Sequence, residues 1–396
     1  MPRDGGAASE SPSARRLRPR TALAIHCGAV LVLLIGVGRY YDSRDGFTSL
    51  IGFGEKQAAS IVPALGQIPH RVPSGSGGYD GQFYVQMALD PLLRDPATDR
   101  ALDDAPLRAR RILLAWTAYV LGLGHPAWIV QAFALQNVFA WLALSVVLRR
   151  WFDLTTARGV SLWLATLFSV GMMMSVRLSL LDGPSLLLLA VAVAAAESNW
   201  HWIAAAAVGV GGLARETNVL GALACVDPRA WSNRRAVVRQ IGLLILALAP
   251  LAIWFDYIHS IYRSLIFTSG ETLARPFAGI LWRAQTVARD ATSGSAGHAL
   301  RSATLVIAFA TQLITVAARP RRDTAWWRIG IAYAALLLFL GRPLWEGMPP
   351  AVVRIELPLL AAFNVLLLRV EDDRWFWLLF VCGNLAAIQA PLVGMP

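Results

Sequence analysis

The stretch ILLAWTAYVLGLG, residues 112–124, decides how the whole chain is arranged. It is apolar but only thirteen residues long, and His125-Pro126 follows it at once. A helix needs about 17 residues to cross the roughly 30 Å hydrocarbon core of a bilayer. We therefore expect residues 112–124 to form a short dipping or interfacial helix that does not span the membrane. Every later segment takes its side of the membrane from this choice.

The composition is that of a multi-span membrane protein. The 396 residues are 56% hydrophobic and 15% charged, whereas a soluble domain is about 45–50% apolar and about 25% charged. The net charge of +11 comes mostly from arginines in short loops; this pattern is typical of cytoplasmic loops and does not indicate nucleic-acid binding. Cys27, Cys225 and Cys382 lie in apolar segments, so neither a disulfide framework nor a zinc site is expected.

We expect an all-α membrane protein, a polytopic bundle of about 11 transmembrane helices. A disordered basic cytoplasmic tail, residues 1–20, precedes a single transmembrane domain, residues 21–396. The first span is interpreted as a retained signal anchor, with a cleaved signal peptide as the alternative. The expected spans are 21–38, 127–148, 160–176, 178–195, 241–258, 302–318, 327–341, 351–368 and 375 to the C-terminus, with short apolar pieces at 200–214 and 218–225.

Two polar loops interrupt the apolar chain. The first, residues 40–111, is expected to carry short interfacial helices, among them residues 82–89 lying along the membrane surface. Asp90-Pro91 would stop that helix, because proline disfavours helical backbone in the residue before it. The second loop, residues 259–300, contains Phe277, Ile280, Leu281, Ala284 and Val287 at helical spacing, which predicts an amphipathic surface helix.

The positive-inside rule supports the choice made for residues 112–124. If this stretch does not span, three short basic loops lie in the cytoplasm with the N-terminus. They contain Arg149/Arg150/Arg158, Arg229/Arg234/Arg235/Arg239 and Arg319/Arg321/Arg322/Arg328. Five polar features then share the outer side: the Asp80 loop, the Arg177/Asp182 turn, Arg215-Glu216, the loop 259–300 and the loop Arg342–Arg354. This arrangement predicts a site on the outer side of the membrane.

The candidate catalytic residue is Asp80, within Gly78-Tyr79-Asp80-Gly81-Gln82-Phe83-Tyr84. An ionised carboxylate at the membrane surface can act as a general base toward an attacking hydroxyl group. The flanking glycines allow the backbone and a substrate to approach closely. Tyr79, Gln82 and Tyr84 are candidate substrate-binding residues for a sugar. The alternative is a Tyr-Asp-Gly turn that is packed by aromatic side chains.

Arg215 and Glu216 interrupt an apolar stretch. Charges at membrane depth cost about 2.5–3.5 kcal/mol each on insertion scales, so they mark a candidate site. Arg215 could contact a phosphate through its planar donor fork, with Glu216 orienting it. The alternative is a mutual ion pair at the tip of a helical hairpin.

Three further residues are candidates for substrate binding. Arg177 and Asp182 frame a helix start, where Asp182 could instead be a plain helix cap that is favoured by the helix dipole. Arg354 lies at the expected outer start of a span and could bind a lipid phosphate. Its alternative role is that of an arginine snorkelling to the membrane surface.

The layout and the Asp80 motif resemble the GT-C superfamily of integral membrane glycosyltransferases. Tyr79-Asp80-Gly81-Gln82-Phe83-Tyr84 is similar to the aromatic-Asp-Gly/Ser-x-aromatic-Tyr pattern of bacterial members related to the glycosylphosphatidylinositol mannosyltransferases. The resemblance implies inverting transfer of a hexose such as mannose from a polyprenyl-phosphate donor to a glycan, lipid or protein acceptor. It makes Asp80 the general base and, by general layout, places Arg215 and Arg354 near the lipid phosphate.

The chain departs from the family in two respects. The motif has no Asp-x-Asp or Glu-Asp pair, so no metal ligand and no cofactor is assigned, and a divalent metal stays open. Asp103-Asp104 is a paired acid, but it lies in a charged stretch that is interpreted as solvated. A soluble C-terminal domain of the oligosaccharyltransferase kind is also absent from the sequence.

Two alternative functions remain at this point. A polymerase or ligase of surface polysaccharide would share the lipid-linked donor but act on long chains. A transporter or flippase would carry out no covalent chemistry. Transporters usually contain internal repeats with broken helices near the midplane. No repeat of fixed period is visible here, and the polar features gather on one side, which favours the enzyme.

Overall fold

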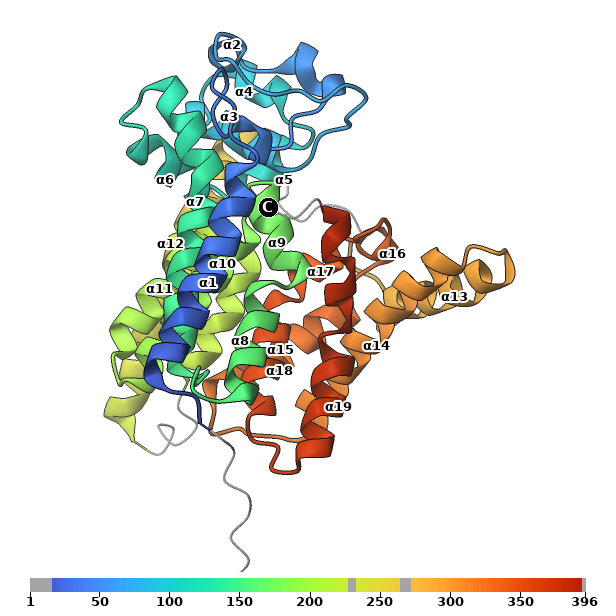
Figure 1. Cartoon of the computed structure of the whole chain (residues 1–396). Helices are drawn as coiled ribbons and strands as arrows, with labels where there is room; N and C mark the ends of the chain where they lie inside the picture. The colour runs from blue at the N-terminus through green and yellow to red at the C-terminus, as the bar shows by residue number, and fades with distance from the viewer. Residues whose placement is uncertain (1–15, 227–232, 264–271, 394–396) are drawn as a thin grey trace, which may run out of the picture.

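The computed structural model describes residues 16–226, 233–263 and 272–393, and every regular element in these ranges is helical (Figure 1). In these ranges β-type pairing is limited to isolated bridges, such as that between Asp42 and Gly46. The predicted all-α class is therefore confirmed. Residues 1–15 of the predicted tail lie outside the described residues, and the first helix, α1 (Pro19–Gly38), begins two positions before the expected span.

Among the residues that the structure describes, four helices are long and apolar enough to cross a membrane. They are α1, α7 (Pro126–Val147, continued by the turn Leu148–Arg150), α12 (Arg234–Tyr262) and α14 (Ala296–Ala318). The pair α8 (Ala157–Leu167) and α9 (Val170–Arg177), bent by 44°, would make a fifth. The predicted count of about 11 spans is not confirmed.

The remaining apolar segments form shorter helices. These are α10 (Asp182–Glu197), α11 (His201–Ala214), α15 (Ala325–Leu338), α18 (Leu357–Leu367) and α19 (Asp373–Gly383), the last followed by the 3₁₀ element η6 (Leu385–Val393). The segment predicted to span at 178–195 starts its helix only at Asp182. The reason is local, since Ser179 adopts a left-handed φ of 47° in the turn after α9.

The apolar piece 218–225 belongs to a 3₁₀ element, η4 (Glu216–Ala224), that packs against α11 and α15. A 3₁₀ helix rises about 2.0 Å per residue, more than the 1.5 Å of an α-helix, so this short segment covers more height than an α-helix would. Its buried Asn218 accepts hydrogen bonds from Ser185 Oγ (2.8 Å) and Tyr333 Oη (3.1 Å). These bonds tie η4 to α10 and α15.

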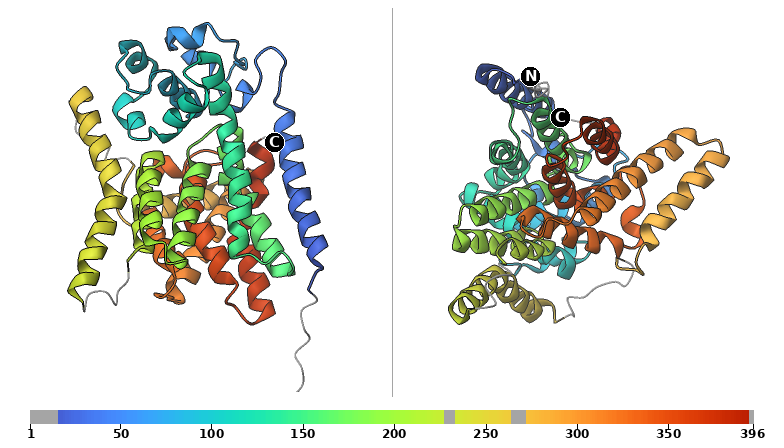
Figure 2. Two further views of the ribbon diagram at one scale, coloured as in Figure 1. Left: turned by 90° about the vertical axis from the view of Figure 1, so that its left-hand side faces the viewer. Right: turned by 90° about the horizontal axis from the view of Figure 1, so that it is seen from below.

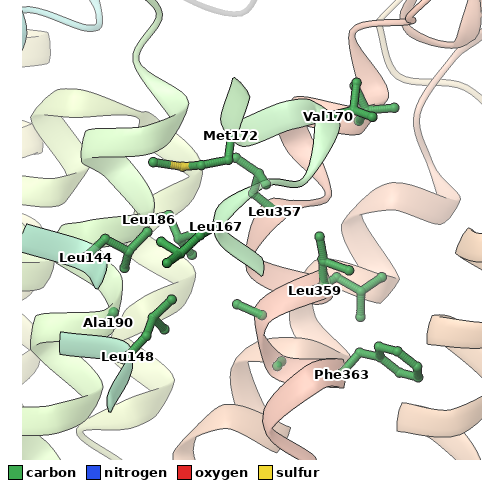
Figure 3. Close-up of a cluster of buried hydrophobic side chains, with 14 of the residues drawn as sticks. Leu144, Leu148, Leu167, Val170, Met172, Leu186, Ala190, Leu357, Leu359 and Phe363 are labelled. Atoms are coloured by element: carbon green, nitrogen blue, oxygen red, sulfur yellow. The ribbon is translucent and has the colours of Figure 1, made fainter. Parts of the chain in front are cut away.

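The core of the bundle is formed by side chains from helices far apart in the sequence (Figure 3). Leu144 and Leu186, of α7 and α10, lie in the same buried cluster as Leu359 and Phe363 of α18. The outer surface is also apolar: α12, for example, exposes Ile253. Apolar surface of this extent is costly in water and suits contact with lipid chains.

Residues 39–125 form a cap over one end of the bundle (Figures 1 and 2). Its elements are η1 (Thr48–Leu50), η2 (Glu55–Ser60), α2 (Pro63–Gly66), α3 (Gly81–Leu89), α4 (Pro96–Ala101), α5 (Ala105–Ala109) and α6 (Leu113–Leu121). The nine residues of α6 are too few to span at about 1.5 Å per residue. The prediction that residues 112–124 form a short helix is confirmed.

Helix α3 is not the surface helix that the sequence predicts. Eight of its nine residues are buried. The two glutamines among them are compatible with burial because their side chains bond to backbone groups of the surrounding loop. Gln82 Oε1 accepts the Gly54 N–H (2.9 Å), and Gln86 Oε1 accepts the Val62 N–H (2.9 Å). Buried amides are tolerated when they are hydrogen-bonded in this way. The predicted end of the helix at Asp90 is confirmed.

The predicted amphipathic helix in the second loop is α13 (Ala278–Thr292), which packs against α14 and α16 (Arg342–Trp345). In Figure 2, α13 and α14 extend sideways from the bundle. The connection is shorter than the expected 259–300, because α12 continues to Tyr262 and α14 begins at Ala296.

The loops at the end of the bundle opposite the cap (Figure 1) include the basic segments that follow α7 and α14. Arg158 donates to Val370 O and pairs with Asp373, and the Trp151 ring lies 5.2 Å from that of Trp326. The loops that follow α7 and α14 therefore meet at this end. The predicted grouping of these two basic loops is consistent with the structure.

Candidate functional site

Asp80 lies where the cap meets the bundle, directly before α3. Its side chain is 26% exposed and does not cap the helix. Instead, Oδ1 lies 3.0 Å from Arg108 Nη2 and Oδ2 lies 3.1 Å from Arg354 Nη1. Arg108 belongs to α5 of the cap, whereas Arg354 belongs to α17 (Val352–Ile355) of the bundle. The carboxylate thus joins two distant parts of the chain.

Two glycines allow close backbone contacts around this site. A Cβ at Gly81 would lie 2.3 Å from Leu178 O and 2.5 Å from Ile51 O, so only glycine fits beside Asp80. A Cβ at Gly171 would lie 2.2 Å from Val353 O, so α9 and α17 also pack through backbone. The first contact positions Asp80 and the second positions Arg354.

The ion pairs continue on both sides of Asp80. Arg354 Nη1 also lies 3.5 Å from Asp182 Oδ2, and Asp182 forms an ion pair with Arg215. On the cap side, Arg108 Nε and Nη2 each donate to the Asp103 carboxylate at 2.8 Å. Positive and negative groups therefore alternate from the cap into the bundle.

A further pair lies beside this series. Arg111 donates to both carboxylate oxygens of Glu216, at 2.8 and 2.7 Å, and to Tyr84 Oη at 3.2 Å. Arg108 Nη1 reaches the same Tyr84 oxygen at 3.5 Å. We call the whole group the Asp80 cluster; its charged members are Asp80, Asp103, Arg108, Arg111, Asp182, Arg215, Glu216 and Arg354.

Arg215 and Glu216 do not form an ion pair with each other in the structure. Arg215 pairs with Asp182, and Glu216 pairs with Arg111. The reason is the extended backbone of Arg215 (φ −154°, ψ 123°) between α11 and η4. Successive side chains on extended backbone point to opposite sides. Glu216 therefore does not orient Arg215, and each residue takes its partner from a different element.

Asp182 is not a plain helix cap, and Arg354 is not a snorkelling arginine. Asp182 is the first residue of α10, makes no capping bond, and contacts two arginines instead. The side chain of Arg354 is 12% exposed and turns inward to Asp80, so it does not snorkel to the surface. Both residues belong to one buried charge network with Arg215.

The charges of the cluster control the ionisation of Asp80. Burial by itself would raise the pKa of this carboxyl, but the positive charges of Arg354 and Arg108 outweigh burial and lower the pKa below 3.8. Asp80 is consequently ionised at neutral pH. Burial of the Tyr79 side chain raises the pKa of its phenol, which keeps that hydroxyl protonated.

The aromatic residues of the motif support the arginines. The Arg354 guanidinium lies 5.1 Å from the centre of the Tyr79 ring, and that of Arg108 lies 4.8 Å from the Phe83 ring. Such cation–π contacts contribute about 0.5–2 kcal/mol each. Gln82 and Tyr84 are 3% and 1% exposed. The structure thus gives these two residues positioning roles, holding the loop and the arginines respectively.

Arg177 does not join the Asp80 cluster. Its Nη1 donates to Ser49 O (2.7 Å), and its guanidinium lies 4.2 Å from the centre of the Tyr40 ring. It lines a separate cavity of about 450 Å³, which we call the Tyr79 cavity. The lining residues are Arg39, Tyr40, Tyr41, Asp42, Ser49, Gly52, Phe53, Arg71, Pro73, Ser76, Gly78, Tyr79, Arg177 and Leu178.

Three arginines of this region carry a buried donor without an acceptor. In the part of the chain that the structure describes, Nε of Arg177, Arg215 and Arg354 has no hydrogen-bond partner. Most buried polar groups in proteins are bonded, so such exceptions mark candidate ligand sites. Phosphate oxygens are suitable acceptors for arginine N–H groups.

Sequence reasoning missed Asp103, Arg108 and Arg111. Asp103 is not simply solvated: it holds Arg108, while Asp104 caps α5 by accepting the Leu107 N–H (3.0 Å). The available signal was the run of arginines at 108–111, directly before the short apolar stretch 112–124. Its position at the expected membrane surface placed these arginines on the same side as Asp80, without indicating which carboxylate each of them contacts.

No group of three or more His, Cys, Asp or Glu side chains within residues 16–226, 233–263 and 272–393 is placed to hold a metal ion. The four carboxylates of the Asp80 cluster contact arginines. Comparison of the chain with protein-family models and with curated proteins found no match.

Proposed function

We propose that this protein is a membrane glycosyltransferase of GT-C type. It transfers a hexose from a polyprenyl-phosphate donor to a hydroxyl group of a glycan, lipid or protein, with inversion at the anomeric carbon. Asp80 is the general base. The observation that carries the proposal is the Asp80 carboxylate, partly exposed and held between Arg108 and Arg354 where the cap meets the bundle.

In this reaction the acceptor oxygen forms a bond to the anomeric carbon of the donor, and the bond from that carbon to the phosphate oxygen breaks. The acceptor proton passes to Asp80, and the electron pair of the broken bond leaves with polyprenyl phosphate. General base catalysis accelerates such reactions about 10²–10⁴-fold. An arginine beside the departing phosphate stabilises its developing charge.

The arginine pairing of Asp80 suggests how the base becomes active. A carboxylate with a lowered pKa is ionised but accepts a proton weakly. A donor phosphate that draws Arg354 away from Asp80 would remove a positive charge and raise the proton affinity of the carboxylate. Arg215 and Arg354 each retain a buried Nε donor for such a phosphate. Donor binding and base activation are coupled in this scheme.

The proposed orientation in the bacterial inner membrane has the N-terminus and the basic loops in the cytoplasm and the cap outside. The short α6 and the gathering of basic loops opposite the cap support this orientation. A lipid-linked donor suits an outer-side site, because nucleotide sugars are not normally available there.

Replacement of Asp80 tests the proposal. A deletion strain carrying Asp80→Asn should lose the glycan modification, and the purified variant should transfer hexose from polyprenyl phosphate about 10²–10⁴ times more slowly. Asp99→Asn is the matched control, because Asp99 is an exposed carboxylate of the same cap. Mass spectrometry of surface glycans and lipid-linked sugars measures the outcome. Full activity of the Asp80 variant, at normal expression, excludes the proposal.

The orientation is tested separately by cysteine labelling. In a variant without Cys27, Cys225 and Cys382, an impermeant thiol reagent should label Ser74→Cys in the cap and not Asp323→Cys in an opposite loop. Both positions are exposed in the structure. Labelling of the second variant in intact cells would reverse the orientation.

A further inference from the structure

The arginines near Tyr79 fall into two groups that differ in their partners. Those of the Asp80 cluster all contact carboxylates. Arg39, Arg71 and Arg177 line the Tyr79 cavity, and none of them forms an ion pair with a described carboxylate. Asp42 is the one acid among the described lining residues, and its Oδ1 accepts the Arg44 N–H at 2.8 Å. The cavity therefore has an excess of positive charge.

Arg177 is the most enclosed of the three arginines. Its guanidinium packs on the Tyr40 ring, and Nη1 is fixed by Ser49 O. Its Nε is buried with no acceptor in the described chain. Arg39 and Arg71 are exposed. A fixed buried donor together with exposed cationic side chains in the same lining is suited to a bound anion.

We propose that the Tyr79 cavity binds a phosphate ester and that this phosphate belongs to the acceptor. Arginine forks match phosphate oxygens in charge and in geometry. The cavity volume of about 450 Å³ lies within the usual range of small-ligand sites, about 300–1,000 Å³. Assignment of the phosphate to the acceptor rests on the proposed glycosyl transfer.

Tyr79 connects this cavity with the proposed base. It lines the cavity, its ring lies under Arg354, and the next residue is Asp80. Asp80 itself is not among the described lining residues. A phosphate held by Arg177 would therefore anchor the acceptor in a cavity whose lining includes the residue next to the base, leaving Arg354 and Arg215 for the donor. Separate phosphate sites would keep the two substrates from competing.

The phosphate could come from a lipid headgroup or from a soluble ester, and binding measurements distinguish the two. The purified full-length protein is titrated by calorimetry with glycerol 3-phosphate, with dihexanoyl phosphatidylglycerol and with dihexanoyl phosphatidylcholine as the zwitterionic reference. Binding of glycerol 3-phosphate indicates a soluble ester. Binding of phosphatidylglycerol alone indicates an anionic lipid headgroup.

Variants then locate the binding. Arg71→Gln and Arg177→Gln should each weaken phosphate binding about tenfold or more, since each removes a charge-assisted contact. Arg94→Gln is the control, because it removes an exposed cap charge outside the cavity. Arg71 is exposed, so its variant keeps the result interpretable if Arg177→Gln unfolds. The inference is overturned if the wild type binds neither phosphate ester, or if Arg71→Gln binds as tightly as the wild type.

The assignment of the cavity as a phosphate site and the proposed function can be disproved independently of each other. Asp80→Asn should lose transfer while retaining phosphate binding in the cavity. If this variant retains transfer, the proposed base is wrong, and the cavity still stands on its binding data. If transfer occurs but Arg71→Gln leaves both phosphate binding and the acceptor KM unchanged, the cavity assignment fails while the proposed function stands.

Discussion

The Asp80 cluster and the Tyr79 cavity lie on either side of one tyrosine and use arginine in opposite ways. In the cluster, four arginines face four carboxylates and most of these groups are partly or fully buried. In the cavity, three arginines are accompanied by one acid, and two of them are exposed. The charges of the cluster balance one another, and the cluster joins the cap to the bundle. The lining of the cavity has more positive than negative groups, and we propose that an anion binds there.

This difference has an energetic consequence. Removal of one partner from a buried ion pair leaves an uncompensated charge and costs about 3–5 kcal/mol. Removal of an exposed charge changes stability by about 0.5 kcal/mol or less. Variants at the most buried members of the cluster, such as Asp182, should therefore damage the fold as well as the chemistry, whereas exposed cavity variants should affect ligand binding alone.

The largest effect on stability is expected at Asp182. Its side chain is 2% exposed and contacts both Arg215 and Arg354, so Asp182→Asn should lower the free energy of unfolding by about 3–5 kcal/mol. Thermal unfolding in detergent measures this loss. Asp373→Asn is the control, because its carboxylate is 79% exposed. Equal stabilities of the two variants would show that the buried ion pairs of the cluster contribute no more to the fold than an exposed pair.

A smaller effect is expected from the pair of Arg111 and Glu216. Both side chains are partly buried, and the contact is bidentate. A double-mutant cycle with Arg111→Gln and Glu216→Gln should give a coupling energy of about 0.5–3 kcal/mol. Additive single effects would indicate that this pair does not help to hold the cap on the bundle.

The pH dependence of transfer tests the link between Arg354 and Asp80. The folded pKa of Asp80 is lowered, so the stability from its ionisation is present above pH 3.8 and is lost as the pH falls through the folded pKa. The acid limb of kcat/KM should likewise lie below pH 3.8. In Arg354→Gln it should move to higher pH, because burial would then be opposed mainly by Arg108. Arg354→Lys, which keeps the charge, should shift less.

The smallest effect on the fold is expected at Arg71. Arg71→Gln should change the free energy of unfolding by about 0.5 kcal/mol or less while it weakens phosphate binding. Thermal unfolding and calorimetry on the same preparation provide both values. A large loss of stability would show that this arginine is part of the framework, and the contrast with the cluster would then be false.

The sequence alone was enough to bring several parts of the site together. The short stretch 112–124 and the basic loops grouped Asp80, Asp182, Arg215 and Arg354 on one side, and the structure brings these four into contact. Their partners were not predictable, because pairing depends on backbone direction. The extended backbone at Arg215 sends neighbouring charges apart, and no local pattern indicates that Arg108 lies beside Asp80.

The fold was predicted in class but not in its number of spans. Apolar runs indicate helices, yet they do not reveal where a helix bends, as between α8 and α9, or where it tightens into a 3₁₀ turn, as in η4. The burial of α3 was also missed. Its glutamines appear polar in the sequence and become compatible with a core only through bonds to Gly54 and Val62.

The bond between Asp80 and Arg354 joins residues 274 positions apart, and this separation sets an order of assembly. A chain is synthesised from its N-terminus, so Asp80 and Arg108 leave the ribosome long before Arg354. A chain that has not yet reached α17 supplies Asp80 with only one of its two arginines. The complete charge set requires α17 packed against Gly171, so the proposed activity requires that this part of the chain has been made and has docked.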